Sequence, residues 1–94
     1  MVRVRRERRE LRANHALCRC IELAKRYDLF VLDASAECAN KLVGCKWVFY
    51  DRISGGELLS YWPHTGLWQG GGMEGEALDM DEAVAVAAAR RKAR

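Results

Sequence analysis

Six aromatic residues fall within 22 positions of this 94-residue chain, in short segments separated by glycines and one proline. Segment 45–50 is rich in aromatic and β-branched residues, and segment 58–62 resumes the pattern after two turn glycines. This alternation predicts a β-hairpin. A second turn at 62–66, with Pro63 early and Gly66 at its end, leads into a third strand at 67–69. Three consecutive glycines at 70–72 are expected to end that strand.

Two helices are expected on either side of these strands. In segment 5–27, the apolar residues fall in one arc of about 160 degrees on a helical projection, as expected of a helix that packs on a core. These residues are Ala13, Ala16, Leu17, Cys20, Ile21, Leu23, Ala24 and Tyr27. Segment 80–92 is the second helix, with Asp79 as N-cap and Glu82 completing a capping box. Its apolar face comprises Met80, Ala83, Val84, Ala87 and Ala88.

The order α-β-β-β-α predicts a single small α+β domain, in which both helices pack on one face of a three-stranded antiparallel sheet. Residues 13–94 form this domain, and residues 1–12 form a basic N-terminal arm or a frayed helix start. Segment 29–32 fits either an extra strand or the end of the first helix. Segment 33–40 fits either a helical turn or a loop.

Composition excludes several classes of protein. Half of the residues are hydrophobic, which is too many for a disordered chain. No apolar run approaches the roughly 18 residues that a membrane-spanning helix needs. The first residues lack the apolar core of a secretory signal, so we expect a cytoplasmic protein without a membrane partner. In that compartment the four cysteines are expected to be thiols, with Cys20 in the core.

Residues that could carry catalysis are few. His15 and Cys18 are three positions apart on the first helix and could form a thiolate pair, but one exposed helix face supplies neither a third group nor a pocket. The set His15, Cys18, Cys38 and Cys45 has zinc-binding residue types without zinc-binding spacing. We therefore predict no catalytic residue, no metal and no cofactor.

The aromatic strands are the better candidate for function, because two helices can cover only one face of the sheet. Aromatic residues on the other face would form a binding surface for a protein partner. The predicted protein-binding residues are Trp47, Tyr50, Tyr61, Trp62, His64 and Trp68. Cross-strand aromatic pairs that only stabilise the sheet are the structural alternative. A homodimer through the same sheet is a variant of the binding hypothesis.

The charges are segregated along the chain. Residues 1–12 have a net charge of +4, residues 90–94 also +4, and the segment between them −5. The alternative function is therefore nucleic-acid binding by the basic arm, assisted by the C-terminal bases. The arm's candidate residues are Arg3, Arg5, Arg6, Arg8, Arg9 and Arg12. Solvated arginine-rich ends that keep the chain soluble are the simpler explanation.

Two resemblances add expectations. The segment Tyr61-Trp62-Pro63-His64-Thr65-Gly66-Leu67-Trp68 resembles a strand–turn–strand of small phage and prophage proteins. That resemblance implies a mobile-element accessory protein or inhibitor that binds a host enzyme or nuclease complex. The element order resembles the double-stranded-RNA-binding domain, which binds RNA with lysines at the start of its second helix. Here that position is acidic, Asp79-Met80-Asp81-Glu82.

Overall fold

The computed structural model describes residues 2–38 and 45–93. The elements in chain order are α1 (Val2–Lys25), β1 (Leu29–Asp33), the short 3-10 helix η1 (Ser35–Glu37), β2 (Trp47–Asp51), β3 (Glu57–Trp62), β4 (Leu67–Gly70), β5 (Met73–Glu76) and α2 (Met80–Ala93). The chain is thus an α+β domain, and both helices and the three predicted strands are present.

The sheet has five antiparallel strands in the order β1-β2-β3-β4-β5, so the predicted three-stranded sheet is wrong. One added strand is β1, which pairs with β2 from Leu29↔Asp51 to Asp33↔Trp47 and resolves the ambiguity of segment 29–32. The other is β5, which pairs with β4 from Leu67↔Glu76 to Gly70↔Met73. The glycines at 70–72 do not end the sheet; they turn the chain into β5.

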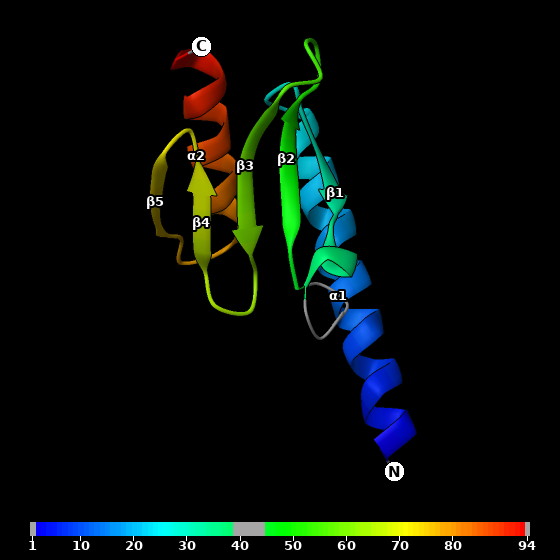
Figure 1. Cartoon of the computed structure of the whole chain (residues 1–94). Coiled ribbons are helices and arrows are strands. Elements are labelled where there is room, and N and C mark those ends of the chain that lie inside the picture. The colour runs from blue at the N-terminus through cyan, green and yellow to red at the C-terminus, as the bar shows by residue number, and fades with distance from the viewer. Residues whose placement is uncertain (1, 39–44, 94) are drawn as a thin grey trace.

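Both helices lie on the same face of this sheet. Figure 1 shows α1 behind β1 and β2, and α2 behind β3 and β4. The two helices also contact each other. The predicted arrangement of helices on one face is therefore confirmed for the described residues, and no described helix covers the opposite face.

The core lies between the helices and the sheet. Its largest fully buried side chains come from the sheet: Trp47, Phe49, Leu29, Leu58 and Leu59. Helix α1 contributes Cys20 and Ala24, and α2 contributes Ala83, Val84 and Ala87. The small side chains of α2 allow its backbone to approach the sheet closely, as the alanine-rich sequence predicts.

Helix α1 ends at Lys25, two residues earlier than predicted. Asp28 adopts a left-handed backbone conformation with φ 58°, which turns the chain into β1. Tyr27 consequently lies outside the helix and is 48% exposed, so its predicted place on the apolar stripe is wrong. Ala16, Leu17, Ile21 and Leu23 of the same stripe do pack against the core.

The capping box predicted for α2 is present with a small change. The Glu82 amide donates a hydrogen bond to Asp79 Oδ1 at 3.0 Å. The Glu82 carboxylate accepts from the backbone amide of Leu78, also at 3.0 Å, one residue before the expected donor. Both bonds occupy polar groups that the start of a helix would otherwise leave to water.

Burial raises the pKa of the Cys20 thiol to about 12, with a smaller contribution from the negative charge of Asp81. The unfolded chain ionises this thiol near pH 9.0, whereas the folded chain keeps it protonated. Between these values the folded state binds more protons, so stability should fall by up to about 1.4 kcal/mol per pH unit. Urea unfolding at pH 8 to 10.5, roughly the start of this window, measures the slope.

The Cys20→Ala variant is the control for this alkaline loss. It is expected to be less stable at neutral pH, because a buried side chain is shortened, but its stability should depend less on pH above 9. An unchanged slope in the variant would contradict the assignment of the loss to Cys20.

Candidate binding surface

The face of the sheet opposite the helices is called here the open face. Strand alternation and the register place five larger apolar side chains on it: Phe30, Leu32, Tyr50, Trp62 and Leu67. Leu32 is 53% exposed and Leu67 46%, while the three aromatic rings are half-buried. We call these five residues the apolar patch. They lie on four neighbouring strands, with Phe30 and Tyr50 toward one end of the face and Trp62 and Leu67 toward the other.

Ring contacts hold the aromatic side chains of the patch in place. Phe30 and Tyr50 are cross-strand partners, and their rings stack with centroids 4.9 Å apart and an interplanar angle of 10°. The Lys46 ammonium lies 5.6 Å from the centroid of the Trp62 ring, within the range of a cation–π contact. Between these pairs, Val48 is only 2% exposed. Large rings fixed in this way lose little side-chain entropy when a partner binds.

Carboxylates also lie on the open face. Glu57 pairs with Tyr50, Glu74 with Gln69, and Glu76 with Leu67, so the register places all three on the open face. All three are exposed, and none forms an ion pair with a cation of the described residues. The open face therefore combines aromatic and aliphatic side chains on β1–β4 with carboxylates on β3–β5.

The predicted binding residues are divided between the two faces. Tyr50 and Trp62 lie on the open face, as described above. Trp47 and Tyr61 are 2% and 3% exposed, and their rings meet in the core with centroids 6.0 Å apart. Trp68 pairs with Tyr61 on the helix side and packs partly buried against the core. The structure thus leaves Trp47 and Tyr61 almost no surface for a partner.

The last of the predicted binding residues, His64, is exposed in the turn between β3 and β4. This turn is held by the Gly66 amide, which donates to the Trp62 carbonyl at 2.8 Å. His64 therefore lies at one end of the sheet, beside the patch residue Trp62 in sequence but outside the strands.

Sequence reasoning missed Phe30, Leu32 and Lys46. Phe30 and Leu32 could have been found from the pattern of segment 29–32, in which every second residue fits the buried face of a strand. Leu29 and Val31 are buried, and Phe30 and Leu32 face the other way. Lys46 has no sequence signal, because its position over Trp62 depends on the pairing of β2 with β3.

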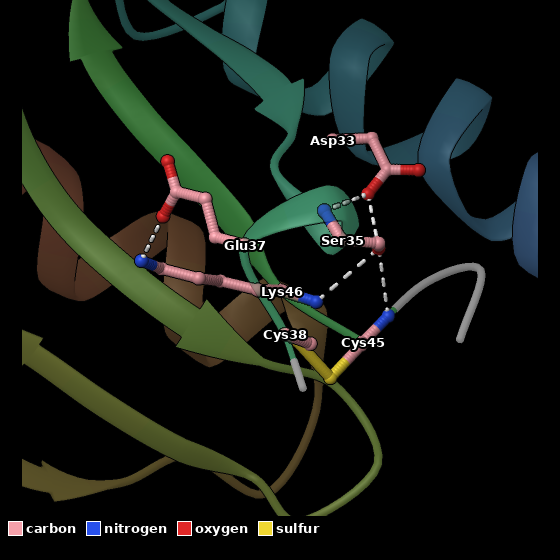
Figure 2. Close-up of polar contacts among 6 residues, drawn as sticks. All are labelled: Asp33, Ser35, Glu37, Cys38, Cys45 and Lys46. Carbon is pink, nitrogen blue, oxygen red and sulfur yellow. Dashed lines mark hydrogen bonds and ion pairs between the residues drawn. A yellow bond between two sulfur atoms is a disulfide. The ribbon is translucent and has the colours of Figure 1, made fainter. Parts of the chain in front are cut away.

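A disulfide joins Cys38, which follows η1, to Cys45, two residues before β2 (Figure 2). This bond corrects the expectation that all four cysteines are thiols, although Cys18 and Cys20 are free. The cytoplasmic location expected from the sequence stays a prediction. Residues 39–44 between the two cysteines lie outside the described residues.

Ser35 anchors the same region. Its hydroxyl oxygen accepts a hydrogen bond from the Cys45 amide at 2.9 Å, and the hydroxyl donates to the Asp33 carboxylate (Figure 2). The Ser35 amide also donates to Asp33 Oδ1 at 2.9 Å. Lys46, the next residue after Cys45, places its ammonium 2.6 Å from a carboxylate oxygen of Glu37. These contacts fix the chain where it enters β2 and where Lys46 reaches Trp62.

Two of the C-terminal bases have internal partners. Arg90 Nε donates to the Leu58 carbonyl at 2.9 Å, and its guanidinium lies where a side chain at Gly71 would be. Arg91 Nε lies 3.2 Å from Asp51 Oδ1, and Arg91 also reaches Asp28 at 4.0 Å. The pKa of Asp51 is lowered first by the backbone amide of Ile53 and also by Arg91. Arg90 and Arg91 therefore hold α2 to the sheet, and Arg94 lies outside the described residues.

The predicted basic arm is helical. Helix α1 begins at Val2 and continues through the arm, and its first half extends well past the end of the sheet (Figure 1). Arg12 is exposed, while the side chains of Arg3, Arg5, Arg6, Arg8 and Arg9 lie outside the part that the structure describes.

The remaining candidates from the sequence are a His–Cys pair, a metal site and a membrane-spanning helix. His15 and Cys18 are exposed on α1. No group of three or more His, Cys, Asp or Glu side chains among the described residues could hold a metal ion. None of the described helices is both long enough and apolar enough to cross a membrane.

Comparisons with protein-family models, curated proteins and solved structures found no match for this chain.

Proposed function

We propose that this chain is a small, non-enzymatic protein that acts by binding another protein through its open face. The apolar patch carries this proposal, because its aromatic side chains lie on a face that no described helix covers. Exposed apolar patches mark interaction sites, and aromatic side chains are enriched where binding energy concentrates. The site therefore comprises Phe30, Leu32, Tyr50, Trp62 and Leu67, with His64 at its border.

The class of partner follows from the resemblance of residues 61–68 to phage and prophage proteins. We propose an accessory protein or inhibitor that binds a host enzyme or nuclease complex. An inhibitor of this size needs a rigid surface rather than a catalytic pocket. The stacked Phe30–Tyr50 pair and the Lys46–Trp62 contact supply that rigidity.

The test is affinity capture from a lysate of the source cells, with nuclease treatment to separate protein partners from nucleic acid. The Trp62→Ala variant should lose at least tenfold in affinity for the captured protein, equivalent to about 1.4 kcal/mol, because it removes the largest ring of the patch. Isothermal titration with the purified partner measures this loss.

Leu78→Ala is the matched control, since Leu78 is 94% exposed and lies outside the five strands. Its affinity should equal that of the unsubstituted chain. Both variants should retain the circular dichroism spectrum of the folded domain. Equal affinities for Trp62→Ala and the unsubstituted chain would show that the open face is not the binding site.

Nucleic-acid binding by the arm is the second candidate function. It is favoured by the continuous helix of α1, which carries the basic segment beyond the sheet (Figure 1). Binding to duplex DNA would weaken with salt, with a slope of about −0.9 per neutralised phosphate. Gel-shift assays at low salt that show no complex would exclude this function.

A further inference from the structure

We infer that the open face of one copy of this chain binds the basic arm, residues 1–12, of a second copy, and that two copies exchange their arms. This inference rests on the proposed role of the open face as a binding surface and names one occupant for it. Three observations carry it: the chemistry of the face, the charge of the arm and the direction in which α1 extends.

The open face fits arginine better than other side chains. A guanidinium stacks on aromatic rings and also pairs with carboxylates through two parallel hydrogen bonds, and its aliphatic stem covers apolar surface. The face presents both kinds of partner side by side, because Tyr50 is the cross-strand neighbour of Glu57 and Leu67 that of Glu76.

The arm has the complementary composition. Residues 1–12 contain six arginines and two glutamates, a net charge of +4. Residues 13–89 have a net charge of −5, and the carboxylates of Glu57, Glu74 and Glu76 have no cationic partner among the described residues. Opposite charges on the two surfaces favour association and set its orientation.

An arm cannot reach the open face of its own chain. Helix α1 is continuous from Val2 to Lys25, packs on the opposite face of the sheet and extends away from it (Figure 1). A contact between arm and open face must therefore join two copies. A reciprocal exchange uses the same two surfaces on each copy, as in a closed two-fold dimer.

The dimensions agree with this contact. A helical segment of 12 residues is about 18 Å long. Strands of five or six residues are about 17–20 Å long, so the arm can lie along the full length of the open face. Two such contacts would together have to bury about 1,200–2,000 Å² to form a stable dimer.

Sedimentation velocity of the full chain over a range of concentrations tests the inference. We expect a dimer at about 0.1 M salt whose dissociation constant rises at least tenfold at about 1 M, because the Debye length falls from about 10 Å to about 3 Å. A chain that is monomeric at all concentrations at the lower salt overturns the inference. A dimer with no salt dependence also overturns it.

Charge reversal identifies the two surfaces. One variant changes the face, Glu74→Lys with Glu76→Lys. The other changes the arm, Arg5→Glu with Arg9→Glu and Arg12→Glu. Each variant alone should be monomeric, because like charges then meet in both contacts. An equimolar mixture should form a heterodimer, since both contacts become complementary again.

Glu22→Lys is the control, because Glu22 is an exposed carboxylate on α1, on the helix side of the sheet. This variant should leave the dimer unchanged.

Circular dichroism of each variant alone first shows that both are folded, because a heterodimer forms only between folded chains. A mixture that remains monomeric overturns the inference, as does binding of the arm to duplex DNA by a chain that stays monomeric. If the dimer is absent while Trp62→Ala still weakens capture of a protein partner, only this inference fails and the proposed function stands.

Discussion

Replacing Trp47 by alanine should lower the free energy of unfolding by about 3–5 kcal/mol, the range for a buried tryptophan truncated to alanine. Trp47 is 2% exposed, and its ring lies against Tyr61 in the core. A domain of this size has a total stability of roughly 5–14 kcal/mol, so the loss would be a large part of it. Urea unfolding followed by circular dichroism measures the change.

The matched comparison is Trp62→Ala, on the open face. This substitution should cost less than about 1.5 kcal/mol, because the ring is half-buried and leaves no enclosed cavity. The contrast separates two aromatic residues that the sequence places in one binding set. If Trp62→Ala destabilised the domain as much as Trp47→Ala, the division into core and open face would be wrong.

Trp47→Phe adds a second control. The indole Nε1 is buried without a hydrogen-bond partner among the described residues. Phenylalanine keeps an aromatic ring and removes this unpaired N–H, which partly offsets the loss of volume. Its cost should therefore be well below that of alanine.

Reduction of the Cys38–Cys45 disulfide should lower stability by roughly 2–3 kcal/mol. The two cysteines are separated by seven positions, and closing a loop of this length in the unfolded chain removes about that much conformational entropy. Urea unfolding with and without a dithiol reductant measures the shift in midpoint.

The Cys38→Ser/Cys45→Ser double variant is the control for reduction. Its midpoint should match that of the reduced chain and should not respond to reductant. The backbone amide of Cys45 should keep its hydrogen bond to Ser35 in this variant. The loss of stability therefore measures the contribution of the disulfide bond. An identical midpoint for the oxidised and reduced chain would contradict the prediction.

The two helices and the central hairpin were predictable because each has a periodic pattern. The alanine-rich stripe of α2 and the N-cap at Asp79 were recognisable from local sequence alone. Strand β5 was not, because Met73-Glu74-Gly75-Glu76 has no apolar alternation. It is a strand because it pairs with β4, where Trp68 lies over Gly75 and leaves no room for a side chain there.

The candidate site was predictable only in part. Alternation along β3 correctly separates Tyr61 from Trp62, but it does not say which face the helices cover. Trp47 and Tyr50 are three positions apart on one strand, so they point to opposite faces, and only the structure assigns each to its side. The disulfide was missed because the spacing of Cys38 and Cys45 does not show that the chain after η1 and the chain before β2 lie side by side.

The two edges of the sheet differ in how they resist aggregation. The outer strand β5 is short, contains a glycine and carries two exposed glutamates, features that discourage another strand from adding to it. The opposite edge, β1, is apolar from Leu29 to Leu32 and reaches a charge only at Asp33. When the domain partly unfolds, strand-by-strand association of chains should therefore begin at β1. Leu32 is 53% exposed, and the substitution Leu32→Lys should suppress this association.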